Sequence, residues 1–516
     1  MKLLLFFLLV CSGALAQTPT PQWRPVYHFT PEAFWTNDPN GPIYLHGEWL
    51  VYNQQNPFEN KWGHMSWGHA KSRDLLHWQH LPVAIPEKID PARGDTTWIF
   101  SGSAVWDEHN SSGFCRDSGC LVAIYTAHQP NLKKESQYIA YSNDGGMSFT
   151  NYPGNPVIDL NKRDFRDPNV FWHAASKQWV MAVALPSEHK VRFYGSSNLR
   201  DWQLLSEFGP EGYTGAHWEC PSLVELPVSG EPGVTKWVLM NSAAGGVRGV
   251  FMQYFVGDFD GKVFHNDNPP DTVLTVDYGD CFYAAIPFND APFDAKILVG
   301  WMIPGVQHTY PWTGQFSIPR DLLLRKTAAG YRLVQEPASV VARSFAALPA
   351  GARRSVAGLV LNHREVEIDS LYGLRGNAWM LDAELEVGVS AVAGFRIGQG
   401  RDAVGRVVSE TVIGYDAAAG QVFVDRSRSG AAKLRPGSER QTIDLGGASG
   451  GGAGGGTRVR LQVLMDKGSL EVFVNGGEKV LTTYVYPEEG GTGCSAFATG
   501  GKAVIKTMRI WDLSKL

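Results

Sequence analysis

The sequence predicts an all-β protein, with a five-bladed β-propeller over residues 25–335 and a C-terminal β-sandwich over residues 345–516. Extended segments rich in β-branched and aromatic residues recur up to about residue 325, and no long amphipathic helix interrupts them. Turn motifs recur there at intervals of roughly 55 to 70 residues, the size of a four-stranded blade with long loops. Beyond about residue 340 aromatic residues become fewer and short alternating strands appear, as in a sandwich.

The first element is an N-terminal apolar segment, residues 1–16. Lys2 precedes a short apolar run, and the segment ends in Ala14-Leu15-Ala16, which is the pattern of a secretory signal peptide and is too short to span a bilayer. We therefore expect a secreted protein, extracellular or periplasmic, with no membrane span. Cys11 raises the alternative of a lipoprotein anchor, which Val10 disfavours because such sites prefer a small residue before the cysteine.

Four turn motifs mark the predicted blades. Each starts with Ser or Gly, continues with Asp or Asn and ends in Trp or Phe, as expected for a turn between two strands. They cover residues 72–78, 142–149, 197–202 and 257–264. The second also fits the S-x-D-x-G-x-S/T-W/F box of sialidase propellers, but it occurs once and without the Arg cluster that a sialidase needs for its substrate carboxylate.

Composition supports this division of the chain and excludes several classes of partner. Of the 516 residues, 57 are Gly, which is about 11% against an average of roughly 7%. This excess indicates many tight turns. The formal net charge is −5, so the chain has no basic footprint for nucleic acid. The Gly-rich run 446–456 has strand-like flanks, and we therefore expect a long loop inside the second domain. We place the domain boundary between residues 335 and 350.

The mature chain would keep five cysteines, an odd number without metal-type spacing. Cys115 and Cys120 flank a short turn and are candidates for a disulfide in an oxidising compartment, with two unpaired thiols as the alternative. Four histidines lie close together in sequence, but no carboxylate or cysteine stands at ligand spacing, and we expect no metal site there. They are His64, His69, His77 and His80.

Three acidic motifs place a carboxylate beside Pro or in a fixed turn. Asp38 lies in the segment WTNDPNG, Asp167 in FRDPN and Glu219 in WECP. A five-bladed propeller gathers the first strands of its blades around one axis, so these three side chains are expected to converge there. Glycoside hydrolysis needs such a set, because it uses one carboxyl group as nucleophile or base and another as acid.

In this order and spacing the motifs resemble the β-fructofuranosidases of glycoside hydrolase family 32, which include invertases, inulinases and levanases. The resemblance covers nearly the whole mature chain. Its motifs are WTNDPNG at 35–41, NQQNP at 53–57, WGHA at 67–70, FSGS at 100–103, RDP at 166–168, ECP at 219–221, PW at 311–312, IPR at 318–320 and SLEVFVN at 469–475.

The resemblance implies that Asp38 is the nucleophile, Glu219 the general acid/base and Asp167 the transition-state stabiliser. We expect Arg166 to keep Asp167 ionised so that this carboxylate binds sugar hydroxyls. The reaction would pass through a covalent fructosyl-enzyme and retain the anomeric configuration. The implied contacts to the fructosyl unit are Asn37, Gln54, Trp62, Phe100, Ser101, Arg166, Asp280 and Trp312.

Two positions depart from the family pattern. Asn53 stands where Tyr is common, and an Asp is usual at the position nearest to Cys281. Either Asp280 supplies that carboxylate after a one-residue shift, or the sugar contact is lost.

The predicted function is a secreted, retaining, cofactor-free hydrolase that releases terminal fructosyl units from levan, inulin or sucrose. The alternatives are a fructosyltransferase, an endo-fructanase or a fructan-binding propeller without turnover. For Trp62 and Trp312 the alternative is packing between blades, where Trp is common. The sequence does not indicate an oligomeric state.

Overall fold

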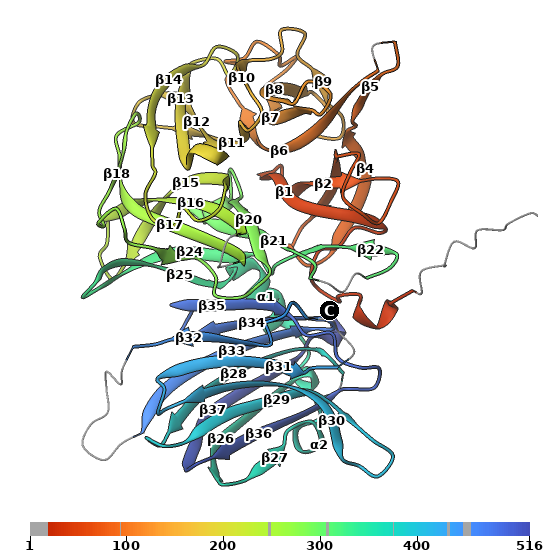
Figure 1. Ribbon diagram of the computed structural model, residues 1–516, viewed down its shortest axis with the longest axis vertical. Coiled ribbons are helices and arrows are strands. Elements are labelled where there is room, and N and C mark those ends of the chain that lie inside the picture. The colour runs from red at the N-terminus through yellow and green to blue at the C-terminus, as the bar shows by residue number, and fades with distance from the viewer. Residues whose placement is uncertain are drawn as a thin grey trace, which may run out of the picture.

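The computed structural model describes residues 19–92, 94–245, 249–305, 309–374, 376–430, 434–446 and 456–516. The chain forms a propeller and a sandwich that lie end to end along its long axis (Figure 1). The predicted fold class is confirmed, since nearly all regular structure is β-strand. The predicted signal peptide, residues 1–16, lies outside the described residues, as does most of the Gly-rich run 446–456.

Each blade is an antiparallel sheet whose first long strand lies nearest the propeller axis. Blade I consists of β1 (Phe34–Leu45), β2 (Glu48–Asn56), β3 (Ser66–Ser72) and β4 (Trp78–Ile85). Blade II consists of β6 (Asp95–Asp107), β7 (Cys120–Gln129), β8 (Lys134–Ser142) and β10 (Ile158–Lys162), with short β5 (Lys88–Asp90) and β9 (Thr150–Asn151). Blade III consists of β11 (Arg166–His173), β12 (Gln178–Leu185), β13 (Lys190–Ser196) and β14 (Gln203–Phe208).

The last two blades are joined into one larger sheet by a parallel pairing of β15 with β24. Blade IV consists of β15 (Trp218–Ser229), β16 (Thr235–Gly245), β17 (Gly249–Phe259), β18 (Phe264–Asn266) and β19 (Leu274–Thr275). Blade V consists of β20 (Phe282–Pro287), β21 (Ile297–Met302), β23 (Gln315–Phe316), β24 (Arg320–Thr327) and β25 (Gly330–Pro337). The ring closes where β22 (Trp312–Thr313) pairs in parallel with the start of β1.

The four predicted turn motifs lead into the outer strands of blades I to IV. In the first, the Ser72 hydroxyl accepts from the Leu75 amide at 2.8 Å, and Asp74 Oδ1 accepts from the His77 amide at 2.9 Å. Ser142 and Asp144 make the equivalent bonds in blade II. Side chains thus satisfy the backbone groups of these turns, and the repeated sequence motif has a repeated structural cause.

A short helix, α1 (Ser339–Ala347), connects the propeller to the sandwich. One sandwich sheet has the order β26-β37-β28-β33-β34-β35 and the other β27-β36-β29-β30-β31-β32. Their bounds are β26 (Arg353–Asn362), β27 (Glu365–Glu367), β28 (Ala378–Val387), β29 (Val392–Arg401), β30 (Val407–Asp416), β31 (Gln421–Arg428), β32 (Arg440–Asp444), β33 (Thr457–Asp466), β34 (Ser469–Val474), β35 (Lys479–Tyr484), β36 (Gly493–Thr499) and β37 (Lys502–Asp512). The one-turn helix α2 (Asp369–Tyr372) follows β27. The Gly-rich run connects β32 to β33, and therefore one sandwich sheet to the other.

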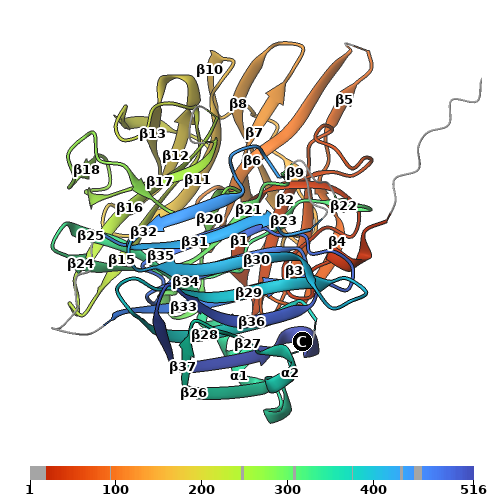
Figure 2. The ribbon, with the colours of Figure 1, turned by 60° about the horizontal axis from the view of Figure 1, so that its bottom comes forward.

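The sandwich packs against the propeller over a shared apolar core, and Figure 2 brings it toward the viewer. This core combines Tyr27 and Phe316 of the propeller part with Val341 and Phe345 of α1 and Phe473 of β34. Such a continuous core holds the two parts in one arrangement.

Two further features bear on the predictions. Cys115 and Cys120 form a disulfide, as proposed from their spacing, whereas Cys220, Cys281 and Cys494 are buried and unpaired. In the part of the chain that the structure describes, no helix has the length and apolar character needed to cross a membrane.

Candidate active site

A β-bulge interrupts the innermost strand of every blade at the same level. In each case two residues oppose a single residue on the neighbouring strand. The bulges lie between Thr36 and Pro39, Ile99 and Gly102, Arg166 and Asn169, Glu219 and Ser222, and Tyr283 and Ile286. Bulges re-aim side chains, and five of them around one axis turn the polar residues of these strands toward a common centre.

A cavity of about 360 Å³ opens at this level of the propeller. All five blades contribute to its wall, and all three predicted catalytic carboxylates line it. The lining residues are Asn37, Asp38, Gln54, Trp62, Phe100, His128, Glu135, Arg163, Asp164, Arg166, Asp167, Glu219, Tyr283 and Trp301. Its volume falls within the range of about 300 to 1,000 Å³ typical of small-molecule sites.

Asp38 is held by hydrogen bonds from two blades. Ser101 Oγ donates to Asp38 Oδ2 at 2.5 Å, and Gln54 Nε2 lies 3.2 Å from the same oxygen. Asn37 Nδ2 donates to the other carboxylate oxygen at 3.2 Å. Burial raises the pKa of Asp38 above its usual value, although the Ser101 hydrogen bond acts in the opposite direction. The donors fix the orientation of this carboxylate toward the cavity.

Asp167 is buried, and its backbone has a positive φ of 66° at the bulge. The Cys220 amide donates to Asp167 Oδ2 at 2.9 Å. The Cys220 sulfur lies 3.6 Å from this oxygen and 3.6 Å from Asp38 Oδ2, so the two carboxylates are neighbours across one thiol. Burial raises the pKa of that thiol well above its usual value, and it remains protonated between them.

Glu219 has one polar partner on each side. Arg166 Nε donates to Glu219 Oε1 at 3.0 Å, and the Tyr283 hydroxyl donates to Oε2 at 2.5 Å. Burial and the charge of Glu219 raise the pKa of Tyr283 well above its usual value, so this hydroxyl keeps its proton. Glu219 is therefore held in a defined orientation while part of its side chain faces the cavity.

Arg166 acts on Asp167 in the expected direction, but its charge does not outweigh burial. The Arg166 guanidinium bonds to Glu219, to Glu135 at 2.9 Å and to Asp164 at 3.1 Å, and its salt bridges do not include Asp167. Burial raises the pKa of Asp167 to about 8, despite the opposing charge of Arg166. The arginine is shared among three other carboxylates, and its charge offsets only part of the effect of burial on the pKa of Asp167.

Most of the predicted sugar contacts lie around the cavity. Asn37, Gln54, Trp62, Phe100 and Arg166 line it, and Ser101 reaches it through its bond to Asp38. Trp62 is 49% exposed and packs edge-on against Trp98 with ring centres 5.2 Å apart. An exposed ring at the mouth of a polar cavity fits sugar stacking better than packing between blades.

Two predicted contacts, Asp280 and Trp312, lie outside the cavity. Asp280 Oδ2 accepts from Arg426 of the sandwich at 2.7 Å, and Oδ1 accepts from Thr483 at 2.7 Å. Trp312 is buried in β22, and the Arg24 guanidinium covers its ring at 3.7 Å. Asp280 instead belongs to the contact between propeller and sandwich, and Trp312 to the closure of the ring, so we correct both assignments.

Sequence reasoning missed several residues of the cavity wall. Tyr283, Glu135 and His128 lie within strands of blades V and II, outside any of the motifs that marked the carboxylates. Trp301 also lines the cavity, and its indole Nε1 is buried without a hydrogen-bond partner among the described residues. Glu135 stands in the polar stretch Lys134 to Gln137 at the start of β8, so no local pattern in the sequence distinguished it.

One group of potential metal ligands lies close together in the described residues, namely Asp107, Cys115 and Cys120. The two cysteines form the disulfide and so offer no thiolate ligand. Of the clustered histidines, His64 pairs with Glu87 at 2.8 Å and His77 with Asp74 at 2.7 Å. These pairings are ordinary side-chain contacts.

The geometry suits chemistry on a neutral sugar. It combines three carboxylates in different hydrogen-bonding environments with amide donors and aromatic rings. Glycosidases divide nucleophilic and acid roles between such carboxylates.

Comparison with known proteins agrees with this geometry. Residues 28–337 match the model for "Glycosyl hydrolases family 32 N-terminal domain", and residues 352–512 match "Glycosyl hydrolases family 32 C terminal". The chain is 40% identical to a levanase of Bacillus subtilis over 96% of this chain and 71% of that protein. It is 34% identical to an extracellular exo-inulinase of Aspergillus awamori over 93% of this chain and 92% of the relative.

Solved structures give the same result. The crystal structure of the Aspergillus awamori exo-inulinase superposes with a TM-score of 0.82 at 32% identity, covering 95% of this chain and 98% of that one. The fructofuranosidase of Schwanniomyces occidentalis, complexed with fructose, superposes with a TM-score of 0.84 at 30% identity, covering 96% and 99% of the two chains. The chain therefore belongs to glycoside hydrolase family 32 and is a β-fructofuranosidase-type hydrolase.

Proposed function

We propose that the protein is a secreted exo-fructanase that releases terminal non-reducing β-D-fructofuranosyl units from levan or inulin, and also from sucrose. The observation that carries this proposal is the convergence of Asp38, Asp167 and Glu219 on one cavity from three different blades. The likeness to a levanase at 40% identity and to an exo-inulinase at 34% supports a polymeric fructan as substrate.

Asp38 is the nucleophile in this proposal. It attacks the anomeric carbon of the fructosyl unit and forms a covalent fructosyl-enzyme, which water then hydrolyses. Three side-chain donors, from Asn37, Gln54 and Ser101, point at its oxygens and support this role by fixing the attacking atom. Two displacements at the same carbon retain the anomeric configuration.

Glu219 is the general acid/base. It gives a proton to the leaving oxygen in the first step and takes one from water in the second. Its partners Tyr283 and Arg166 support this role because they hold the carboxyl group from both sides. The two-step reaction needs no cofactor, since both displacements use side-chain carboxyl groups.

Asp167 stabilises the transition state by hydrogen bonding to sugar hydroxyls. Its raised pKa gives it a proton to donate below about pH 8, so it can act as donor as well as acceptor. Trp62 and Phe100 then supply aromatic surface for the apolar face of the sugar.

The size of the cavity supports release from chain ends. About 360 Å³ lies near the lower end of the range for small-molecule sites, which fits a terminal unit better than the middle of a polymer. Secretion is supported by the apolar segment 1–16 and by the Cys115–Cys120 disulfide, because disulfides persist in oxidising compartments.

The test is to incubate the enzyme separately with levan, inulin and sucrose and to separate the products by chromatography. Fructose as the first and main product from both polymers supports the proposal. Oligosaccharides appearing before fructose would instead indicate endo-cleavage, and longer chains from sucrose would indicate a fructosyltransferase. Absence of products from all three substrates would indicate a fructan-binding propeller without turnover.

A further inference from the structure

A second cavity, of about 280 Å³, lies at the opposite mouth of the propeller. Its wall includes Trp106 at the end of β6 and Trp172 near the end of β11. The same two strands carry Phe100, near the middle of β6, and Asp167, near the start of β11, both of which line the candidate active site. Five or six residues, including a bulge, separate the two levels on each strand, which is at most about 17–20 Å. The second cavity is therefore a separate site.

Three indole rings dominate this cavity. Trp172 is 46% exposed, and it meets Trp179 edge to face with ring centres 5.1 Å apart. Trp106 lies across the cavity on the neighbouring blade. A large apolar ring left open to solvent beside a cavity, and braced by a second ring, is typical of a surface that stacks against a ligand.

The polar groups around the rings carry no strong positive charge. Glu108, Asp290 and Ser111 offer carboxylate and hydroxyl oxygens, and His109 is the one ionisable donor among the lining residues. No Lys or Arg is part of the wall. Carboxylates repel anions, and acceptors beside aromatic rings suit the hydroxyl groups of an uncharged sugar.

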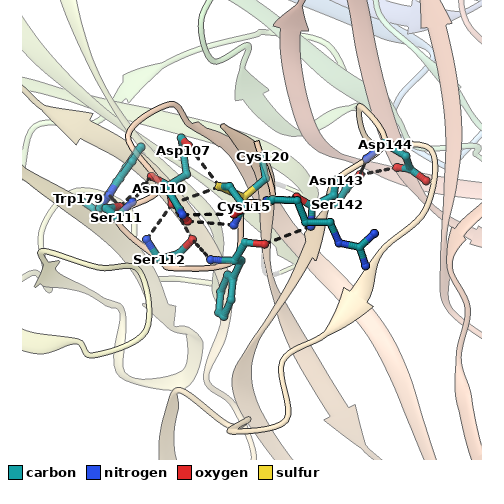
Figure 3. The surroundings of a disulfide bond; sticks show 12 residues. Asp107, Asn110, Ser111, Ser112, Cys115, Cys120, Ser142, Asn143, Asp144 and Trp179 are labelled. Carbon is teal, nitrogen blue, oxygen red and sulfur yellow. Dashed lines mark hydrogen bonds between the residues drawn. A yellow bond between two sulfur atoms is a disulfide. The ribbon is translucent and has the colours of Figure 1, made fainter. Parts of the chain in front are cut away.

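The wall of the cavity is preformed by a network around the disulfide (Figure 3). Both Asp107 carboxylate oxygens accept from the turn that follows, with bonds of 2.8 Å from the amides of Ser111 and Ser112. Trp179 Nε1 donates to the Ser111 hydroxyl at 3.0 Å. Asn110 Oδ1 accepts from the Cys115 amide at 2.9 Å, which ties this turn to the Cys115–Cys120 loop.

A second set of hydrogen bonds connects blades II and III. Asn289 Nδ2 donates to the carbonyl oxygens of Ala104 at 2.8 Å and Val170 at 3.1 Å. These carbonyls lie on β6 and β11, two residues before Trp106 and Trp172 respectively. The spacing between the two tryptophans is thereby fixed, so a ligand would find the surface already in place.

We propose that this cavity is a second carbohydrate site that binds internal fructosyl units of the polymeric substrate on Trp172. The inference rests on the proposed function, because it takes the fructan chain as the occupant. The cavity lies apart from Asp38, Asp167 and Glu219, and its role is to hold the polymer near the enzyme. Such anchoring raises the effective concentration of chain ends without changing the chemical step.

The experiment is affinity electrophoresis in gels that contain levan or inulin. The protein carries Asp38→Ala so that the polymer is not degraded during the run. We expect the added change Trp172→Ala to weaken the apparent affinity for the polymer at least about fivefold, as loss of a central aromatic contact does. The added change Leu204→Ala, which removes another exposed apolar side chain on β14, is the matched control and should leave retardation unchanged.

Kinetics on the otherwise unchanged enzyme provide the second readout. Trp172→Ala should raise KM for the polymer and leave kcat/KM for sucrose as it was. If Trp172→Ala lowers the melting temperature, Glu108→Ala at the rim of the cavity replaces it as the test variant. Unchanged retardation together with an unchanged polymer KM would overturn the inference. An enzyme that releases fructose from no fructan would instead overturn the proposed function.

Discussion

Two regions of this molecule bury carboxylates in contrasting ways, namely the cavity at the propeller axis and the interface between propeller and sandwich. At the interface Arg320 is fully buried and pairs with Asp277 at 2.9 Å and with Glu471. His28 adds bonds to Asp466 at 2.8 Å and to Glu471 at 2.9 Å. In the cavity one arginine serves three carboxylates, and no salt bridge to Asp38 or Asp167 occurs in the described residues.

This difference in counter-charge is clearest between Glu471 at the interface and Asp38 and Asp167 in the cavity. Asp277 at the interface still has a raised pKa, because burial outweighs the charge of Arg320. Burial favours the protonated form of Glu471, yet Arg320 and His28 outweigh it and hold the pKa of that carboxyl below its usual value. Burial also opposes the charge on His28, but the bonds to Asp466 and Glu471 raise its pKa to about 9. At Asp38 and Asp167 burial prevails and both pKa values rise. Counter-charge thus keeps Glu471 ionised at the interface, whereas Asp38 and Asp167 have no salt bridge among the described residues.

The largest expected effect is on turnover in the cavity. Asp38→Ala should lower kcat by on the order of 10⁴- to 10⁶-fold, as removal of a nucleophile does in other hydrolases. The melting temperature should stay the same or rise, because a buried carboxylate without a salt bridge is removed. Fructose release and thermal unfolding measured on the same preparation check both parts, and a variant with near-normal turnover would contradict the assignment.

At the interface we expect a substitution to lower stability and to leave turnover unchanged. Glu471→Gln should lower the free energy of unfolding by about 3–5 kcal/mol, since it leaves Arg320 and His28 with an incomplete set of partners. The enzyme that remains folded at low temperature should keep its kcat. Denaturant unfolding followed by far-ultraviolet circular dichroism measures the loss. The idea fails if stability is unchanged or if kcat falls as it does in Asp38→Ala.

A smaller effect is expected from the tyrosine that holds Glu219. Tyr283→Phe removes the hydroxyl that donates to Glu219 and should lower kcat about 10- to 100-fold with little change in KM. Tyr52→Phe is the matched control, because its hydroxyl bonds to the Gly146 carbonyl oxygen away from the cavity. Steady-state kinetics of both variants decide the point, and an equal loss in the control would count against a specific role for Tyr283.

The smallest effect concerns stability and pH. The folded pKa of Asp167, about 8, lies above its unfolded value, so stability declines as pH rises from about 4 through 8. Asp167→Asn should therefore stabilise the protein, and by more at pH 8 than near pH 4. The folded pKa of Glu471 is lowered, so its ionised carboxyl group stabilises the fold, and this stabilisation is lost as pH falls. The loss of stability caused by Glu471→Gln should therefore become smaller toward low pH. Melting temperatures across this range test the sign, and a gain that grows toward low pH would refute it.

The fold and the central carboxylates were accessible from sequence because local chemistry specifies them. Ser72 and Asp74 satisfy their own turn, and the same pattern repeats from blade to blade. Asp38 and Asp167 each precede a proline in an innermost strand. In both cases residues close together in sequence determine the structure, so a single sequence contains the signal.

The remaining details depend on contacts between distant residues. Asp280 pairs with Arg426, which lies 146 residues further along the chain, and Trp312 is covered by Arg24. The bulge at Tyr283 and the sharing of Arg166 among three carboxylates likewise arise only when blades meet. No local pattern reports such pairings, and this explains why two sugar contacts were assigned wrongly and Tyr283 was missed.

Identifying the carboxylate that becomes covalently attached to the sugar tests the division of roles most directly. The variant Glu219→Gln should be mixed with a fructosyl donor whose leaving group needs no acid, quenched rapidly, digested and examined by mass spectrometry. Loss of the acid/base slows hydrolysis of the intermediate, which should accumulate. We predict one added fructosyl unit on the peptide that contains Asp38. An adduct on Asp167 or on an interface carboxylate such as Glu471 would contradict the account.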